Sequence, residues 1–366
     1  MSWREQPRKQ RDDFREPVIF NVSRIEPDPP FPRRSHFEQM EMTEPGRAGP
    51  LVSIVIPNYN HASYLAAAID SVLNQDYPRV ELIVIDDGST DGSRDILSRY
   101  SGRCHCETQP NRGQVVTMNR GWNMSQGEIL GFLASDDLLL PGAISRMVRC
   151  LVENPDAVLV YPDFNLIDPD SAIVRRVVTP EFDYTEMVTK FVCPPGPGAL
   201  FRRAAFEKAG GWDESLKQML DFEYWLRLGL LGRFLRVPEV LAAYRIHEGS
   251  QTFAASTSQI RTEEPIEIMQ RFFAGDIVPT AIMAKKTQAL SYAHLCSAQL
   301  HFRVGNFGKG LTALRRAFSH WPRIVLSARA GRIVFNILFS RAAHQTLWTI
   351  RRAIRSLTRK LAKPSD

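Results

Sequence analysis

The feature that most constrains the fold of this chain is a series of apolar runs that each end in polar side chains. Three of them read "SIVIPNYN" (residues 53–60), "ELIVIDDGSTDGS" (residues 81–93) and "ILGFLASDD" (residues 129–137). Segments with the helical spacing of apolar residues lie between these runs, for example at residues 63–74. Strand-like and helical segments that alternate in this way predict a mostly parallel sheet sandwiched by helices.

The alternation starts sharply at Leu51, and from about residue 258 the pattern is helical to the end. We expect strands at Val52–Ile56, Val80–Asp86, Ile129–Ala134 and Ala157–Tyr161. We expect helices near Ser63–Asn74 and Gln114–Ser125. The predicted fold class is therefore α/β, with a helical C-terminal extension.

Three regions differ in composition. Residues 1–50 carry eight prolines among nine basic and nine acidic residues without periodicity, which predicts an extended or disordered leader. Residues 51–255 hold the alternating pattern and are expected to form the α/β domain. Residues 256–366 are expected to form a helical region with a basic amphipathic end.

The net charge of +6 is unevenly distributed, because residues 301–366 hold 14 basic residues and one acidic residue. Residues 51–300 hold 23 basic and 30 acidic residues, which is not the composition of a nucleic-acid-binding surface. Near the C-terminus, "LWTIRRAIRSLTRKL" places five apolar side chains on one helical stripe: Leu347, Ile350, Ile354, Leu357 and Leu361. A basic amphipathic helix of this kind is expected to contact an anionic membrane surface, and packing on protein is the alternative.

The five cysteines give little sign of a disulfide framework or a zinc site. Only Cys104 and Cys106 are close in sequence, and no second pair completes a zinc site. We expect reduced thiols in a cytoplasmic protein. The N-terminal residues contain no apolar core, so no secretory signal is expected, and no run approaches the ~18 apolar residues of a membrane span.

The polar ends of the runs are candidate ligand-binding residues, since ligands of parallel sheets bind beyond the carboxyl ends of the strands. The adjacent carboxylates Asp136 and Asp137 suit a divalent cation that in turn holds a diphosphate. A bound metal would also offset the repulsion between them. The sequence contains neither of the glycine-rich phosphate-binding loops GxxxxGK[ST] and GxGxxG. The alternative is that Asp136 caps the next helix, or that both acids are solvated.

The same residues carry a resemblance to a known family. "SIVIPNYNHASYLAAAIDSVLNQDYPRVELIVIDDGSTDGS" and "SDD" resemble the family 2 inverting glycosyltransferases, which have the GT-A nucleotide-sugar fold. "GALFRRAAFEKAGGWDESLKQMLDFEYWLRL" and "YRIHEGSQT" resemble the acceptor half of the same family. The match covers roughly residues 51–252. It implies a nucleotide-sugar half over residues 51–140 and an acceptor half over residues 141–255.

The resemblance implies a nucleotide pocket along the carboxyl ends of the first two strands. Pro57, Tyr59 and Asn60 would line the base and ribose, and a tyrosine ring offers a stacking face. Asp86 would accept a hydrogen bond from the ring N–H of a uracil-type base, although Asp is also a frequent turn residue. Arg112 would reach the base or the phosphates.

The resemblance also implies a metal site that binds Mn²⁺ or Mg²⁺. Asp136 would contact the ribose, Asp137 would bind the metal, and His247 would complete the site. A neutral imidazole suits Mn²⁺ better than Mg²⁺. The alternative for His247 is an ordinary loop histidine, and Arg245 would face the diphosphate or pair with an acid.

Inverting transfer needs a base that removes the proton of the acceptor hydroxyl. In "LKQMLDFEYWLRL", Asp221 matches the catalytic base of the family, and Glu223 is the alternative. The usual glutamate before the base is Leu220 here, which leaves Asp221 without that acidic neighbour.

The expected function is metal-dependent, inverting hexosyl transfer from a nucleoside-diphosphate sugar, most simply a UDP sugar, to a glycan or lipid-linked acceptor. Bacterial cell-surface polysaccharide synthesis by a cytoplasmic protein, peripheral at the inner face of the membrane, would fit. A nucleotidyltransferase is disfavoured because "PNYNHASY" is not a basic, glycine-rich loop. A non-catalytic nucleotide- or glycan-binding protein on the same fold is the remaining alternative, and Leu220 is the one feature that favours it.

Overall fold

The computed structural model describes residues 49–247, 249–250 and 261–339. These residues belong to two compact units. The first takes in residues up to 188 and from 192 to 250, and the second takes in residues 189–191 and 261–339. The predicted leader, apart from residues 49–50, and the predicted basic stripe from Leu347 onward lie outside the described residues.

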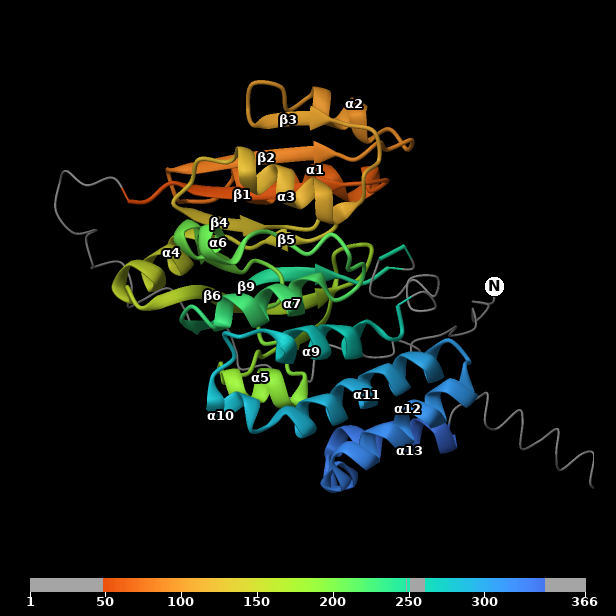
Figure 1. Ribbon diagram of the computed structural model, residues 1–366. Helices are drawn as coiled ribbons and strands as arrows, with labels where there is room; N and C mark the ends of the chain where they lie inside the picture. Colours follow the sequence, from red (N-terminus) through yellow and green to blue (C-terminus); the bar gives the residue numbers. More distant parts are fainter. Residues whose placement is uncertain (1–48, 248, 251–260, 340–366) are drawn as a thin grey trace, which may run out of the picture. The chain divides into compact units, whose positions relative to one another are not determined.

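The first unit contains a nine-stranded sheet in the order β3-β2-β1-β4-β8-β6-β9-β5, with β7 paired to β6 (Figure 1). The strands are β1 (Val52–Asn58), β2 (Val80–Asp86), β3 (His105–Thr108), β4 (Ile129–Phe132), β5 (Leu138–Leu139), β6 (Ala157–Ile167), β7 (Ile173–Val177), β8 (Leu200–Arg202) and β9 (Arg233–Arg245). Strands β3, β2, β1 and β4 are parallel, whereas β8 runs antiparallel to both β4 and β6. The α/β fold predicted from the sequence is confirmed.

Helices cover both faces of this sheet. They are α1 (Ala62–Leu73), α2 (Ser93–Ser98), α3 (Gln114–Met124), α4 (Ala143–Glu153), α6 (Arg203–Ala209) and α7 (Leu220–Gly229). Helix α5 (Tyr184–Lys190) is joined to α7 by a hydrogen bond from the Tyr184 hydroxyl to the Leu226 carbonyl (2.9 Å). Helices α1, α2 and α4 share one apolar core with Ile54 and Ile56 of β1. The face with α3, α6 and α7 is drawn toward the viewer in Figure 1. Its core is aromatic, because Trp122 of α3 contacts Phe201 and stacks on Tyr224 of α7.

The contact between α3 and β1 is close enough to require glycine. A Cβ atom on Gly121 would collide with the side chain of Val55, which faces α3. Because β-branched Val55 has little freedom to move, α3 can lie this near the sheet only with a glycine at position 121. This packing fixes the loop at residues 109–113, which leads directly into α3.

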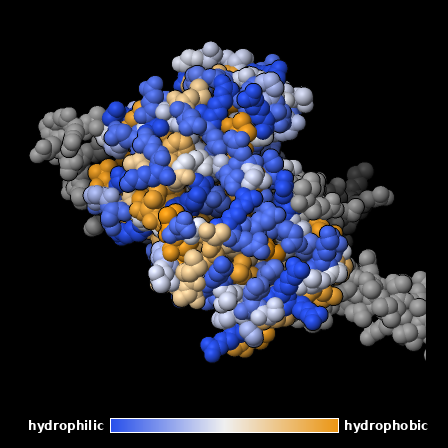
Figure 2. All heavy atoms as spheres, in the orientation of Figure 1, coloured by the Kyte–Doolittle hydropathy of each residue, from blue (hydrophilic) through white to orange (hydrophobic). Residues whose placement is uncertain are grey.

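The second unit is helical over its described residues, as predicted. It contains α9 (Glu264–Ala274), α10 (Thr280–Met283), α11 (Lys286–Arg303), α12 (Phe307–His320), the 3₁₀ helix η1 (Pro322–Leu326) and α13 (Ala328–Phe339). Small residues bring α11 and α12 together, and Ser291 Oγ of α11 donates a hydrogen bond to the Ala317 carbonyl of α12 (2.7 Å). Within the described residues, every helix is too short or too polar to cross a membrane. The face shown in Figure 2 is mostly hydrophilic, with hydrophobic residues in separate patches.

Candidate functional site

The carboxyl ends of β1 and β2 lie side by side, since Asn58 is paired with Asp86 in the parallel register. Asp86 is fully buried, and its Oδ1 accepts a hydrogen bond from Asn58 Nδ2 (2.8 Å). Its Oδ2 accepts one from the backbone N–H of Ser89 (3.1 Å), whose hydroxyl accepts one from the backbone N–H of Asn60 (2.8 Å). These contacts clamp the two loops together, so Asp86 builds the edge of the sheet on which a ligand would rest.

Asp87 holds a third loop at the same edge. Its Oδ1 accepts hydrogen bonds from Gln109 Nε2 and from the backbone N–H of Arg112, both at 2.8 Å. Its Oδ2 accepts one from the backbone N–H of Gly113 (2.7 Å). Arg112 is thereby anchored at the edge through its backbone, with an exposed side chain.

The remaining residues predicted for the nucleotide differ in exposure. Pro57 is buried in β1, whereas the side chain of Tyr59 is half-exposed at 49%. Asn60 adopts a left-handed backbone conformation (φ 55°), and its side-chain oxygen accepts a hydrogen bond from the N–H of Thr90 (2.8 Å). Tyr59 therefore presents an exposed aromatic ring on which a planar base could stack.

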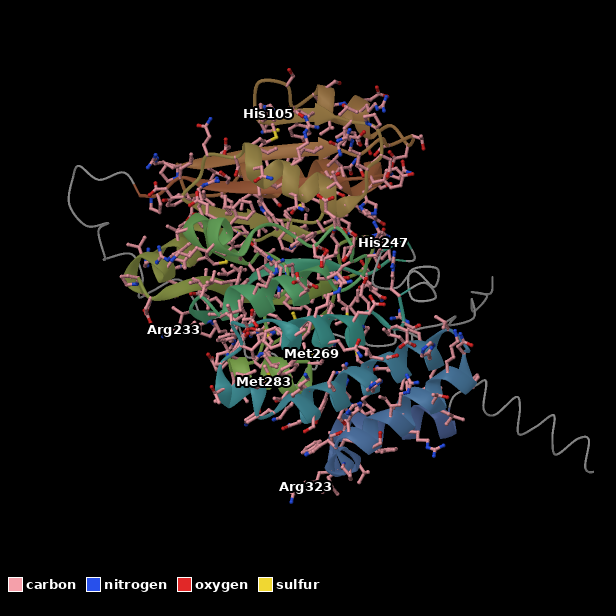
Figure 3. All side chains as sticks on the ribbon, in the orientation of Figure 1. His105, Arg233, His247, Met269, Met283 and Arg323 are labelled. Carbon is pink, nitrogen blue, oxygen red and sulfur yellow. The ribbon has the colours of Figure 1, made fainter. Side chains whose placement is uncertain are left out.

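Beyond the ends of β1, β4 and β9, the chain brings together His61, Asp136 and His247. One potential ligand atom from each lies within 4.8 Å of the other two. His247 Nε2 is 2.9 Å from Asp136 Oδ2, and the rings of His61 and His247 are 5.5 Å apart. His61 Nδ1 also contacts Ser135 Oγ at 2.9 Å. Figure 3 shows His247 on the side of the sheet toward which β1 and β2 point. These three residues are the candidate metal site, and we call them the His-Asp-His cluster.

Asp137 lies outside the His-Asp-His cluster. Its carboxylate is buried and accepts a hydrogen bond from the backbone N–H of Arg245 (2.9 Å). Burial, and then the neighbouring charge of Asp136, raise the pKa of Asp137 well above its usual range. The structure pairs His247 with Asp136, whereas the family resemblance implies a metal bound by Asp137 and His247. His61 was missed, although it directly follows the polar end of the first strand.

Arg245 stabilises the turn that carries both aspartates. It is 1% exposed, and its Nε donates to the Asp136 carbonyl (2.8 Å) while Nη1 donates to the Asp168 carbonyl (2.9 Å). Its guanidinium also lies 4.7 Å from the centre of the Tyr64 ring. Because its guanidinium donates hydrogen bonds to backbone carbonyls, Arg245 stabilises the turn that carries Asp136 and Asp137.

Asp221 stands in the first turn of α7 in a desolvated setting. Part of its surface is exposed, but burial of the carboxyl raises its pKa to about 6. The N–H of Phe222 donates to Oδ1 (2.7 Å) and partly offsets this effect. The preceding Leu220 is 5% exposed and packs inward, which gives the departure from the family pattern a structural role.

Glu223, the alternative base, is held by an arginine. Arg227 Nε and Nη2 donate to the two carboxylate oxygens of Glu223, both at 2.7 Å. Arg227 Nη2 also donates to the Gly211 carbonyl (2.8 Å), so this pair ties α7 to the turn before it. Both carboxylate oxygens of Glu223 are therefore engaged by Arg227.

Comparison with known proteins agrees with this architecture. Residues 53–210 match the model of glycosyl transferase family 2. An uncharacterized glycosyltransferase of Rickettsia typhi is 34% identical over 232 residues, which covers 59% of this chain and 70% of the relative. The chain belongs to glycosyltransferase family 2. Another uncharacterized glycosyltransferase, from Nostoc sp., is 28% identical over 243 residues, covering 60% of this chain and 74% of the relative.

Solved structures show the same fold at low identity. S. aureus TarS 1–349 in complex with UDP-GlcNAc superposes with a TM-score of 0.54 at 17% identity, covering 72% of this chain and 90% of TarS 1–349. The mannosyltransferase PcManGT from Pyrobaculum calidifontis, in complex with GDP-Man and Mn²⁺, gives a TM-score of 0.53 at 17% identity, covering 87% of this chain and 88% of that one. The predicted GT-A fold and the enzyme class are confirmed.

Proposed function

We propose that this family 2 glycosyltransferase is metal-dependent and inverting, and that it transfers a hexose from a nucleoside-diphosphate sugar to a hydroxyl of a glycan or lipid-linked acceptor. The observation that carries the proposal is the His-Asp-His cluster at the edge where strands β1, β2 and β4 end. A role in cell-surface polysaccharide synthesis has further support, since the chondroitin synthase of Pasteurella multocida is 28% identical over 195 residues. That match covers 20% of the synthase and 52% of this chain.

The His-Asp-His cluster fits a divalent ion, because its three potential ligand atoms converge within 4.8 Å. Two imidazoles and one carboxylate suit Mn²⁺ better than Mg²⁺, which prefers oxygen ligands. Bound there, the ion would act as a Lewis acid on the departing diphosphate. We assign His61, Asp136 and His247 as the ligands of this ion. We propose that Asp137 supports the site through its hydrogen bond with the Arg245 amide.

The nucleotide is proposed to lie along the clamped loops after β1 and β2. Tyr59 offers its half-exposed ring to the base, and Pro57 and Asn60 fix the loop that presents it. Asp86 is proposed to lie beneath the nucleobase, and the exposed Arg112 is proposed to contact the base or a phosphate. A UDP sugar is the proposed donor.

Asp221 is the proposed catalytic base. With a pKa of about 6, its carboxylate is mostly ionised at neutral pH and is still more basic than an ordinary aspartate. It takes the proton of the acceptor hydroxyl as that oxygen attacks the anomeric carbon and the diphosphate leaves.

The basic C-terminal residues are proposed to hold the enzyme at an anionic membrane surface at its cytoplasmic face. Residues 301–366 carry 14 basic residues against one acidic residue, and each basic residue near such a surface contributes ~1 kcal/mol. Co-sedimentation with phosphatidylserine vesicles tests this at two salt concentrations. Equal binding to neutral vesicles would contradict it.

The enzymatic proposal is tested by release of nucleoside diphosphate from a panel of nucleotide sugars, with Mn²⁺, Mg²⁺ or chelator. We expect Mn²⁺-dependent release that is lost in Asp136→Ala and retained in Asp95→Ala, an exposed carboxylate on α2. Release that persists in chelator would refute metal dependence. No release and no nucleotide-dependent thermal shift with any donor would favour the non-catalytic binding protein.

A further inference from the structure

Two cysteines that the proposed reaction does not use lie in contact at the start of β3. The Sγ atoms of Cys104 and Cys106 are 3.4 Å apart, and both side chains are half-buried. His105, labelled in Figure 3, lies between them in sequence. Both thiols pack against the apolar core under α2, and the Cys104 thiol approaches the Tyr100 carbonyl at 4.0 Å.

The contact between the two sulfurs shifts the pKa values of both thiols. The hydrogen bond between them, opposed by burial and assisted by the neighbouring His105, lowers the pKa of Cys106 to about 7. The same hydrogen bond, together with burial, raises the pKa of Cys104. Burial raises the pKa of each of the other cysteines, namely Cys150, Cys193 and Cys296. Cys106 is therefore the sulfur most able to react with an oxidant near neutral pH.

We propose that Cys104 and Cys106 form an oxidisable dithiol that a peroxide converts to a disulfide, and that this disulfide loosens the neighbouring loop at residues 109–113. The Cys106 thiolate attacks one peroxide oxygen, the O–O bond breaks, and the departing hydroxide takes up a proton to become water. Cys106 is then a sulfenic acid. The Cys104 sulfur attacks the Cys106 sulfur as its thiol proton leaves, the S–O bond breaks, and a second water forms. Two thiols and one peroxide give one disulfide and two waters.

The link to the loop follows from the position of β3. Strand β3 is at the end of the sheet and pairs with β2 alone (Figure 1). A disulfide requires the two sulfurs to approach from 3.4 Å to ~2.05 Å, and we expect the backbone over Cys104–Cys106 to bend as they do. Three residues further on, Gln109 donates its backbone N–H to the Asp86 carbonyl (2.9 Å) and its side-chain amide to Asp87 (2.8 Å). A bend in β3 therefore strains the contacts through which Asp87 holds the loop.

Formation of the disulfide does not depend on the proposed function. Any effect of the disulfide on binding of the donor nucleotide does rest on the proposed function. The first test uses the reduced full-length protein, hydrogen peroxide, alkylation of the remaining thiols and mass analysis. Cleavage after Arg103 and Arg112 releases both cysteines in one peptide, "CHCETQPNR". We expect this peptide to lose two hydrogens, to escape alkylation and to recover with dithiothreitol.

Variants separate the two sulfurs. Cys104→Ser is expected to stop at a sulfenic acid that dimedone labels on Cys106. Cys106→Ser is expected to lose the fast reaction with peroxide. The matched control is Cys150→Ser, which removes another half-buried thiol and should retain the fast reaction. A peptide in which both thiols stay alkylatable after peroxide overturns the proposal, as does an unchanged reaction rate in Cys106→Ser.

The effect on the loop is tested without a donor, by amide hydrogen exchange of the same full-length protein. The N–H groups of Arg112 and Gly113, both bonded to Asp87, are expected to exchange roughly 5-fold faster or more after oxidation. Equal exchange in the oxidised and reduced proteins would overturn the coupling. Failure of the enzyme to bind any nucleotide would refute the proposed function and leave both of these measurements interpretable.

Discussion

Asp221→Asn is the substitution that most directly tests the chemistry derived from the structure, because it should change activity and stability in opposite directions. A rise in pKa from 3.8 to about 6 means that the folded protein disfavours the charged carboxylate. Each pKa unit corresponds to about 1.4 kcal/mol, so the full shift is worth about 3 kcal/mol. Partial exposure of Asp221 reduces this to about 1–3 kcal/mol.

The sign follows from the direction of the shift. Between about pH 4 and pH 6 the folded state binds a proton that the unfolded state has released, so the wild type loses stability as the pH rises through this range. Above about pH 7 the folded protein carries the full free-energy cost of the buried Asp221 carboxylate, and near pH 4 this cost has almost vanished. Asparagine never carries the charge. Asp221→Asn should therefore be more stable than the wild type at pH 8, and this advantage should disappear near pH 4.

The assay is thermal unfolding at pH 4 and pH 8, combined with kcat at pH 8. We expect a Tm gain of roughly 2–4 °C per kcal/mol at pH 8 and a loss of kcat of ~10²–10⁴. Glu223→Gln is the matched control on the same helix. It breaks the pair with Arg227, so it should be less stable than the wild type and retain turnover. An Asp221→Asn variant with normal turnover, or without a stability gain at pH 8, would refute the reasoning.

Three further predictions concern the metal site, the packing of α3 and the edge of the sheet. His61→Ala should weaken Mn²⁺ binding, measured by calorimetry. The loss should be at least the ~10–100-fold that follows when a hydrogen-bond partner of a metal ligand is removed. His105→Ala is the control and should leave Mn²⁺ binding unchanged. Gly121→Ala should destabilise the protein by about 1–3 kcal/mol in urea unfolding, since its Cβ meets Val55, and equal stability would contradict that contact. Gly331→Ala, on α13 with open space around it, is the control and should be neutral or stabilising by up to about 1 kcal/mol. Asp87→Ala removes an acceptor of three hydrogen bonds, so limited proteolysis should cut the chain faster near Arg112, and an unchanged rate would count against this anchor.

The sequence was sufficient to predict β1, β2, β4 and the first half of β6, because buried strands of this kind read as apolar runs. Strands β3, β5, β7, β8 and β9 were not predicted, and β8 is the clearest case. It is three residues long, Leu200–Arg202, and its antiparallel place between β4 and β6 is set by partners far along the chain. No local pattern encodes such a pairing. The division into a donor half and an acceptor half near residue 140 stays a prediction.

The site was harder to predict than the fold. The family resemblance brought Asp136, Asp137 and His247 together as candidates, but only the turn geometry decides which carboxylate faces the histidine. His61 was passed over because a single histidine in a loop carries little information until a second one is known to lie 5.5 Å away. Similarly, Leu220 looked like a lost acid and is in fact a core residue of α7.

Two like charges can stand side by side in this chain because the turn directs them into different environments. Asp137 points into the protein, accepts the Arg245 amide and has a raised pKa. Asp136 points to His247 and accepts its hydrogen bond or, in the proposed enzyme, shares an ion with it. Arg245 donates to the backbone between them and so holds the turn that separates the two carboxylates. The acidic pair therefore combines one carboxylate bonded to the backbone with one bonded to a histidine, and under the proposed function replacing Asp137 should disturb the metal site only through the position of Asp136.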